Sequence, residues 1–292
     1  MGVQLPGRAG ALRARIALVS MLGLGLLALT GCASETQDTW RRVAMPEPAT
    51  KEGIRILEFW QWSWVAAMVT GVIVWALMFW VVWRYRRRSD GDVPVQTRYN
   101  LPLEIFYTIA PIIMVIAFFG RTVSLQTDLI ETPEADHTVE VVGQQWSWTF
   151  NYVDEPAAEG KNVFESGTGS YIPTLVLPVD ESVKFELRSP DVIHSFWITA
   201  FLYKEDIIPG RVNEFVVTPN TIGSFQGKCA ELCGTLHSRM LFNVEVVSRA
   251  DYDAYLKDQI AKGFWSDEAL RGNEETITQA GLEAGIPEGG TE

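Results

Sequence analysis

The sequence of 292 residues is poor in cysteine, histidine and positive charge, and each shortage excludes a class of protein. Three cysteines are too few for a small domain built on disulfides. Against 36 acidic residues there are 24 lysines and arginines, so the net charge is −12 and no basic surface predicts a nucleic-acid partner. The few cysteines in such a chain are more often metal ligands or lipid anchors, so their positions matter most.

An export signal is predicted at the N-terminus. Three arginines precede a short apolar stretch over residues 16–29, which is the pattern of a signal peptide. The stretch ends in Leu-Thr-Gly-Cys at Cys32, which resembles a bacterial lipobox. We therefore expect residues 1–31 to be removed, the Cys32 thiol to carry lipid, and residues 32–58 to be exported. A plain signal peptide with an incidental cysteine is the alternative.

Two further apolar runs predict a transmembrane helical hairpin over residues 59–125. Residues 59–83 are 25 positions without a charge, more than the roughly 20 that cross a bilayer. Between Glu104 and Arg121 only 16 residues are uncharged, so these ends must lie near an interface or a protein contact. The connecting loop 84–100 holds five arginines and two aspartates, which predicts that it is cytoplasmic and that both flanks lie outside.

Short strands rich in Val, Leu and Phe dominate residues 126–264. They are predicted at residues 138–142, 174–178, 182–187, 214–217 and 241–247. This spacing indicates a small antiparallel sandwich or a Greek-key barrel, with a helix near residues 251–262. The acidic C-terminal tail, residues 265–292, has few large apolar groups and is expected to be loose.

The charge is divided unevenly along the chain. Residues 101–292 hold 12 basic and 29 acidic residues, a net charge of −17, whereas residues 1–100 carry +5. An exported domain this acidic would attract a basic partner in a salt-dependent way. Its acidity could equally serve only to keep the domain soluble.

Two cysteines, a histidine and a methionine fall within twelve residues: Cys229, Cys233, His237 and Met240. His194 lies upstream. Thiolates, imidazoles and a thioether form a soft ligand set that suits copper, and two thiolates could bridge two copper ions. A Cys₂His₂ zinc site, a structural disulfide and a copper chaperone with a Cys-x-x-x-Cys motif remain as alternatives.

The segments Cys-x-Glu-x-Cys-Gly-x-x-His-x-x-Met and Asp-Val-x-His-Ser-Phe-Trp resemble those of subunit II of haem–copper cytochrome c oxidases. The resemblance runs from about residue 60 to residue 247. It implies a membrane-anchored all-β protein, with a two-helix transmembrane hairpin followed by a cupredoxin-like Greek-key β-barrel that holds a dinuclear copper centre, CuA. The implied copper ligands are the bridging Cys229 and Cys233, the terminal His194 and His237, the weakly bound Met240 and the main-chain carbonyl of Glu231. The Glu231 side chain would point toward a magnesium site shared with subunit I.

Two further segments also resemble the family. The aromatic stretch 143–150 implies that Trp146 receives electrons from cytochrome c, whereas we expect Trp148 to pack inside the barrel. Glu104 would lie at the cytoplasmic mouth of a proton path into subunit I, although a carboxylate in the first turn of a helix is also simply favourable. His137 is interpreted as a solvated residue before a strand.

The resemblance therefore implies the electron-input subunit of a proton-pumping oxidase in a bacterial cell membrane. The chain would be multi-pass with its C-terminal domain on the extracytoplasmic side, and oxygen would be reduced in subunit I. Expected partners are subunit I and the other oxidase subunits, membrane lipid, and cytochrome c or a membrane-tethered c-type haem protein. No Cys-x-x-Cys-His motif is present, so the donor haem must belong to another protein. A lipid-anchored copper chaperone or assembly protein is the alternative function.

Overall fold

The computed structural model describes residues 34–89, 91, 96–130 and 134–272. Contacts divide the chain into two compact units, residues 1–45 and 46–292. The first unit contributes a short helix, α2 (Ser34–Arg41). The predicted signal peptide and the lipidation of Cys32 lie outside the described residues.

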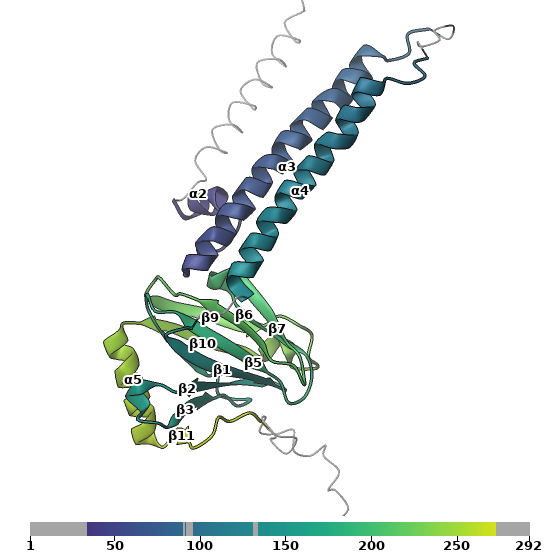
Figure 1. The fold of residues 1–292 in the computed structure, drawn as a ribbon. Coiled ribbons are helices and arrows are strands. Elements are labelled where there is room, and N and C mark those ends of the chain that lie inside the picture. The colour runs from purple at the N-terminus through teal and green to yellow at the C-terminus, as the bar shows by residue number, and fades with distance from the viewer. Residues whose placement is uncertain (1–33, 90, 92–95, 131–133, 273–292) are drawn as a thin grey trace, which may run out of the picture. The chain divides into compact units, whose positions relative to one another are not determined.

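The second unit begins with two long apolar helices (Figure 1). Helix α3 spans Lys51–Arg84 and helix α4 spans Leu101–Ile130, and each is long and apolar enough to cross a membrane. Arg55 of α3 forms an ion pair with Asp128 of α4. The chain therefore contains the predicted helical hairpin.

Both helices run past the predicted limits of the hairpin, residues 59 and 125. Helix α3 starts early because the Thr50 side chain caps it, accepting a hydrogen bond from the backbone N–H of Gly53 at 2.9 Å. The next acidic residue, Glu52, accepts a hydrogen bond from the backbone N–H of Thr218 at 2.8 Å. The polar first turn of α3 is therefore stabilised by the Thr50 cap and by the hydrogen bond of Glu52. A hydropathy pattern reveals neither contact.

The rest of this unit is a β-domain of two sheets (Figure 1). The six-stranded sheet has the order β11-β3-β2-β1-β5-β8, with β1 (His137–Gln144), β2 (Ser147–Val153), β3 (Asn162–Ser166), β5 (Val183–Arg188), β8 (Asn213–Val217) and β11 (Trp265–Ser266). The five-stranded sheet has the order β4-β10-β9-β6-β7, with β4 (Thr174–Pro178), β6 (His194–Ile198), β7 (Tyr203–Ile207), β9 (Gly223–Cys229) and β10 (Leu241–Val247). The 3₁₀ turns η1 (Pro156–Ala158), η2 (Thr199–Phe201) and η3 (His237–Arg239) and the helix α5 (Arg249–Lys262) connect or follow these strands.

All five strands predicted from the sequence are present, and the helix predicted near residues 251–262 is α5. A purely antiparallel sandwich, however, is wrong. Strand β1 pairs in parallel with β5, and β4 pairs in parallel with β10. Each of these pairs joins strands that are far apart in the sequence, so the connection can return in the same direction. The alternation of apolar residues within a strand carries no information about that direction.

Aromatic rings form the core between the sheets. Trp148 and Phe150 of β2 pack against Phe242 of β10 at centroid distances of 5.1 and 5.4 Å. Phe196 of β6 stacks on Phe242 at 5.0 Å. Strand β9 lies between β6 and β10, and a Cβ on its Gly227 would lie 1.9 Å from the Phe242 ring, so this position needs glycine. Trp148 is fully buried, which confirms that it packs the core.

The interpretation of His137 as a solvated residue is wrong, because its side chain is only 1% exposed. Its Nδ1 lies 2.9 Å from the carboxylate of Glu155, and its Nε2 lies 2.8 Å from Glu181 and 3.1 Å from Arg249. Tyr252 of α5 donates to Glu155 at 2.9 Å. Burial lowers the pKa of the imidazole, but the two carboxylates outweigh it, so this pKa lies above its ordinary value. These partners are distant in the sequence, so no local pattern indicates the contact.

Replacing His137 with alanine should lower the free energy of unfolding of the β-domain by about 3 kcal/mol, because the buried Glu155 would lose its cationic partner and keep only the Tyr252 hydroxyl. The folded-state pKa of His137 is raised above its ordinary value of 6.5. Its stabilising contribution is therefore complete below that value and is lost as the pH rises through the raised pKa. Urea unfolding of both proteins over this pH range would measure the two effects.

Asp258→Ala is the matched control, because Asp258 forms an exposed ion pair with Lys262 on α5. It should change the free energy of unfolding by less than about 1 kcal/mol. If His137→Ala were as stable as wild type at every pH, the buried cluster would contribute nothing to the fold.

Candidate metal centre

The predicted copper ligands converge at one end of the five-stranded sheet. His194 begins β6, Cys229 ends the antiparallel neighbour β9, and Met240 immediately precedes β10. Antiparallel neighbours bring the start of one strand to the end of the next, so the three residues meet although they are far apart in sequence. The backbone N–H of Cys229 donates to the carbonyl of Met240 at 3.0 Å, which holds this edge together.

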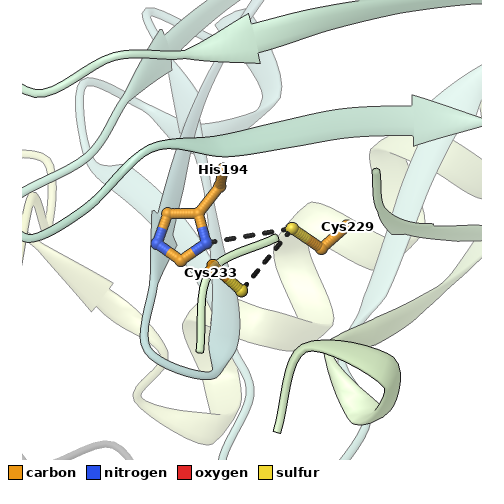
Figure 2. A group of neighbouring side chains, drawn as sticks. All are labelled: His194, Cys229 and Cys233. Atoms are coloured by element: carbon orange, nitrogen blue, oxygen red, sulfur yellow. Dashed lines mark hydrogen bonds between the residues drawn. The ribbon is translucent and has the colours of Figure 1, made fainter. Parts of the chain in front are cut away.

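Three sulfur atoms and two imidazole nitrogens face one another there. Cys229 Sγ lies 3.8 Å from Cys233 Sγ and 3.9 Å from His194 Nδ1. The dashed lines in Figure 2 mark these two contacts. Cys233 Sγ lies 3.6 Å from His237 Nδ1 and 3.8 Å from Met240 Sδ. The ligand atoms of His194 and the two cysteines all lie within 4.8 Å of one another, close enough to bind the same metal site.

Asp191 fixes the orientation of the His194 ring. One carboxylate oxygen lies 2.8 Å from His194 Nε2, and the other accepts a hydrogen bond from the backbone N–H of Gln145 at 2.6 Å. With Nε2 engaged, Nδ1 is left facing Cys229, as is usual for a metal-binding histidine. Burial lowers the pKa of His194, but Asp191 and Cys229 raise it by more, so it lies above its ordinary value.

Asp191 contacts a predicted ligand, although the sequence analysis gave it no role. Its position three residues before His194, within Asp-Val-x-His, was the only available signal. The hydrogen bond to Gln145 has no such signal, because the two residues are 46 positions apart.

The two thiols are free, and their acidities differ. Their separation of 3.8 Å is far above the roughly 2.05 Å of a disulfide bond, so the disulfide alternative does not describe this structure. Burial raises the pKa of Cys229, but His194 and the backbone of Ser195 and Glu231 together lower it by more, to about 6. Burial and the neighbouring Cys229 raise the pKa of Cys233 to about 12. Cys229 is therefore the more acidic of the two thiols.

The ligand set fits copper better than zinc. Two cysteines and two histidines alone would satisfy a tetrahedral zinc ion. Met240, however, is fully buried and its thioether lies 3.8 Å from Cys233 Sγ. A thioether beside thiolates and imidazoles is typical of copper. The carbonyl oxygen of Glu231 lies 3.2 Å from Cys229 Sγ, so an oxygen atom also faces the same site.

Comparisons with known proteins agree with this chemistry. The family described as "Cytochrome C oxidase subunit II, periplasmic domain" matches residues 137–247. A probable cytochrome c oxidase subunit 2 of Streptomyces coelicolor is 45% identical over 276 residues, covering 82% of this chain and 85% of that protein. The chain belongs to the cytochrome c oxidase subunit II family.

A more distant relative is the cytochrome c oxidase subunit 2 of Corynebacterium glutamicum, 33% identical over 306 residues, which covers 84% of this chain and 85% of that protein. Among solved structures, the periplasmic domain of subunit II of cytochrome oxidase from Bradyrhizobium japonicum is 30% identical. The match covers 45% of this chain and 98% of the solved chain, with a TM-score of 0.41. As a subunit II, the chain is part of an oxidoreductase complex, with a periplasmic-type β-domain after two membrane helices.

Trp146 of this subunit II lies against the cysteine loop. Its indole N–H donates to the carbonyl of Cys233 at 3.1 Å, and the Gln145 amide donates to the same oxygen at 2.7 Å. Trp146 is half-buried, so part of the ring is open to solvent. The indole is thus one hydrogen bond from the backbone of a predicted copper ligand.

Other predicted residues lie elsewhere. The Glu231 side chain is exposed, whereas its carbonyl faces the site. Glu104 is at the start of α4, where its carboxylate accepts a hydrogen bond from the backbone N–H of Asn100 at 2.9 Å. The Asn100 side chain in turn accepts from Leu103 N–H at 3.3 Å. This reciprocal capping gives Glu104 a structural role that the sequence analysis had left open.

Proposed function

We propose that this subunit II is the electron-input subunit of a proton-pumping cytochrome c oxidase. It accepts electrons from cytochrome c or a membrane-tethered c-type haem protein and delivers them to haem in subunit I, where oxygen is reduced to water. The observation that carries the proposal is the pair of free thiols 3.8 Å apart, each facing an imidazole nitrogen.

In this proposal the chain holds a dinuclear copper centre. Cys229 and Cys233 would hold it through their thiolates, His194 and His237 through Nδ1, Met240 through its thioether, and Glu231 through its main-chain carbonyl. Bound there, the two copper ions supply a carrier for a single electron.

The chain's own contribution is rigidity. Asp191 fixes the ring of His194, the Cys229 N–H is bonded to the Met240 carbonyl, and the Ala230 N–H donates to Ser195 at 3.0 Å. Ligands that are held in place before the electron arrives need little rearrangement, and this preorganisation favours fast transfer.

Trp146 is the proposed contact for the donor. Its partly open aromatic face suits a docking surface, and its hydrogen bond to Cys233 connects that face to the ligand loop. The acidic exported domain favours a basic donor.

Three further roles are proposed for side chains that do not ligate copper. The Glu231 carboxylate would ligate a magnesium ion shared with subunit I, and Glu104 would admit protons to a path in subunit I. Cys32 would carry lipid after removal of the signal peptide, and the chain would cross the cell membrane twice with its β-domain outside.

Metal analysis and electron paramagnetic resonance of the oxidase test the copper centre. Wild type should hold two coppers in this subunit with one unpaired electron shared between them. Cys229→Ser or Cys233→Ser should abolish that shared signal, because a serine oxygen is a hard ligand and cannot bridge copper as a thiolate does. Ser238→Ala, in an exposed neighbour on η3, is the matched control and should keep it. One zinc, or a single copper that a chelator removes readily, would favour the zinc or chaperone alternatives.

Trp146→Ala should slow electron input from cytochrome c while copper content and the resonance spectrum stay unchanged. Loss of a central interface aromatic removes about 2 kcal/mol of docking energy, which corresponds to about a thirtyfold change. Stopped-flow reduction at limiting cytochrome c would measure the rate. Trp148→Phe, beneath the site but fully buried, should lower stability with little effect on docking. An unchanged rate in Trp146→Ala would assign that residue to packing alone.

Glu104→Gln should slow proton uptake and turnover with normal copper reduction, because glutamine can still accept the capping hydrogen bond but cannot ionise. Asn100→Ala is the control, since it removes the cap and keeps the carboxylate. Turnover and proton pumping in reconstituted vesicles are the measurements. If the glutamine variant pumps normally and only the Asn100 variant is impaired, the role of Glu104 is to cap α4.

A further inference from the structure

The two long apolar helices leave a groove between them near the β-domain. It has a volume of about 300 Å³ and is lined by three residues of each helix: Glu58, Phe59 and Trp62 of α3, and Ala117, Phe118 and Arg121 of α4. Residues three and four apart lie on one face of a helix, so each helix presents a single face to the groove. The β-domain is close, because Glu52, hydrogen-bonded to Thr218, lies only about 9 Å along α3 from Glu58.

The groove lies where both apolar runs end. Glu58 is the last charged residue before the uncharged run 59–83 of α3, and Arg121 is the first charged residue after the uncharged run 105–120 of α4. The hydrocarbon core of a bilayer excludes charged side chains, so charges that bound such runs lie at the level of the lipid headgroups. In the proposed topology the groove therefore opens at the headgroups of the outer leaflet.

The two charged side chains of the groove are opposite in sign and unpaired. Both Glu58 and Arg121 are exposed, and within the part of the chain that the structure describes neither side chain forms a hydrogen bond or an ion pair. Closer to the β-domain, Arg55 and Asp128 do form an ion pair between the same two helices. The groove thus offers one anionic and one cationic group to a ligand.

Aromatic rings form much of the remaining wall. Phe59 and Phe118 are half-buried and their ring centroids lie 6.1 Å apart, so they connect the two helices at the groove. Trp62 is 70% exposed. An indole is favoured at the headgroup level of a membrane, and its face attracts an ammonium group. The uncharged runs lead from the groove toward the opposite membrane surface, so a molecule held by its polar head can extend acyl chains along both helices.

The pair of charges selects the class of ligand. A guanidinium binds a phosphate through two parallel hydrogen bonds, and a carboxylate pairs with an ammonium group. A phospholipid that carries both groups in one headgroup satisfies Arg121 and Glu58 together, whereas a purely anionic headgroup would leave Glu58 unpaired beside a like charge.

We propose that this groove binds the headgroup of one phosphatidylethanolamine molecule, with its phosphate at Arg121 and its ammonium group at Glu58 and Trp62. The proposal rests on the proposed crossing of the membrane by α3 and α4, and it does not involve the copper centre.

Native mass spectrometry of the complete oxidase tests the site, with phosphatidylethanolamine added in a mild detergent as the probe. Glu58→Gln and Arg121→Gln should each bind this lipid about tenfold more weakly and retain one molecule fewer than wild type, because each loses a charge-assisted contact. Glu47→Gln and Arg98→Gln are the matched controls. Both residues are exposed, precede α3 and α4 respectively, and lie outside the groove lining, so they should retain as much lipid as wild type.

A second probe, phosphatidylglycerol, tests the choice of headgroup, since it carries the phosphate without the ammonium group. Wild type should prefer phosphatidylethanolamine about tenfold, and Glu58→Gln should lose this preference because the carboxylate that pairs with the ammonium group is gone. Arg121→Lys keeps the positive charge, so it should retain more lipid than Arg121→Gln and preserve the preference.

Equal lipid retention in wild type, Glu58→Gln and Arg121→Gln would overturn the proposal, and so would equal binding of the two lipids by wild type. Loss of subunit I from these variants in the same spectra, with the lipid count unchanged, would also overturn it, because the groove would then be a contact between subunits.

Failure of this proposal is distinguishable from failure of the proposed topology. Ser89→Cys places a thiol in the loop between the helices, where a membrane-impermeant reagent should label it only after the cells are permeabilised. Labelling of position 89 in intact cells would contradict the topology. If that position is protected and wild type still retains no lipid at the groove, only the lipid site is wrong.

Discussion

The metal site depends on the packing of β9 beneath two stacked phenylalanine rings, which come from the strands on either side of it. Phe196 and Phe242 stack across β9, and Gly227 leaves the space that the Phe242 ring occupies. Side chains alternate along a strand, so Cys229, two residues later, points to the same buried face. That face also receives His194 from β6 and Met240 from the start of β10. The aromatic core thus determines where the first thiolate lies, and the other ligands are arranged around it.

Hydrogen bonds around the metal site connect the ligands to the surface. Asp191 holds both the His194 ring and the Gln145 backbone, while Gln145 and Trp146 both donate to the Cys233 carbonyl. The turn that carries Gln145 and Trp146 therefore contacts Cys233 directly and His194 through Asp191. The aromatic contact for a partner and the orientation of the metal ligands are consequently parts of one bonded unit.

The sequence was sufficient for features that depend on local patterns. Uncharged runs predicted both membrane helices, alternating apolar residues predicted the strands, and the Cys229 to Met240 spacing predicted the ligand cluster. Long-range pairing was not predictable in this way. His137 was misjudged because Glu155 and Glu181 are distant in sequence, and the parallel pairing of β1 with β5 has no signature inside either strand. Residues 265–272 were wrongly predicted as the start of a loose tail because of their acidic composition, whereas β11 pairs with β3 and Arg271 is bound by the buried Glu140.

Gly227 also limits how this protein can vary. It binds no metal and contacts no proposed partner, yet any side chain there would overlap the Phe242 ring. Even a single methyl group would push β9 away from its neighbours and carry Cys229 with it. A substitution that leaves every ligand unchanged can therefore still abolish the site. Gly227 is such a position, although glycine is small and chemically inert.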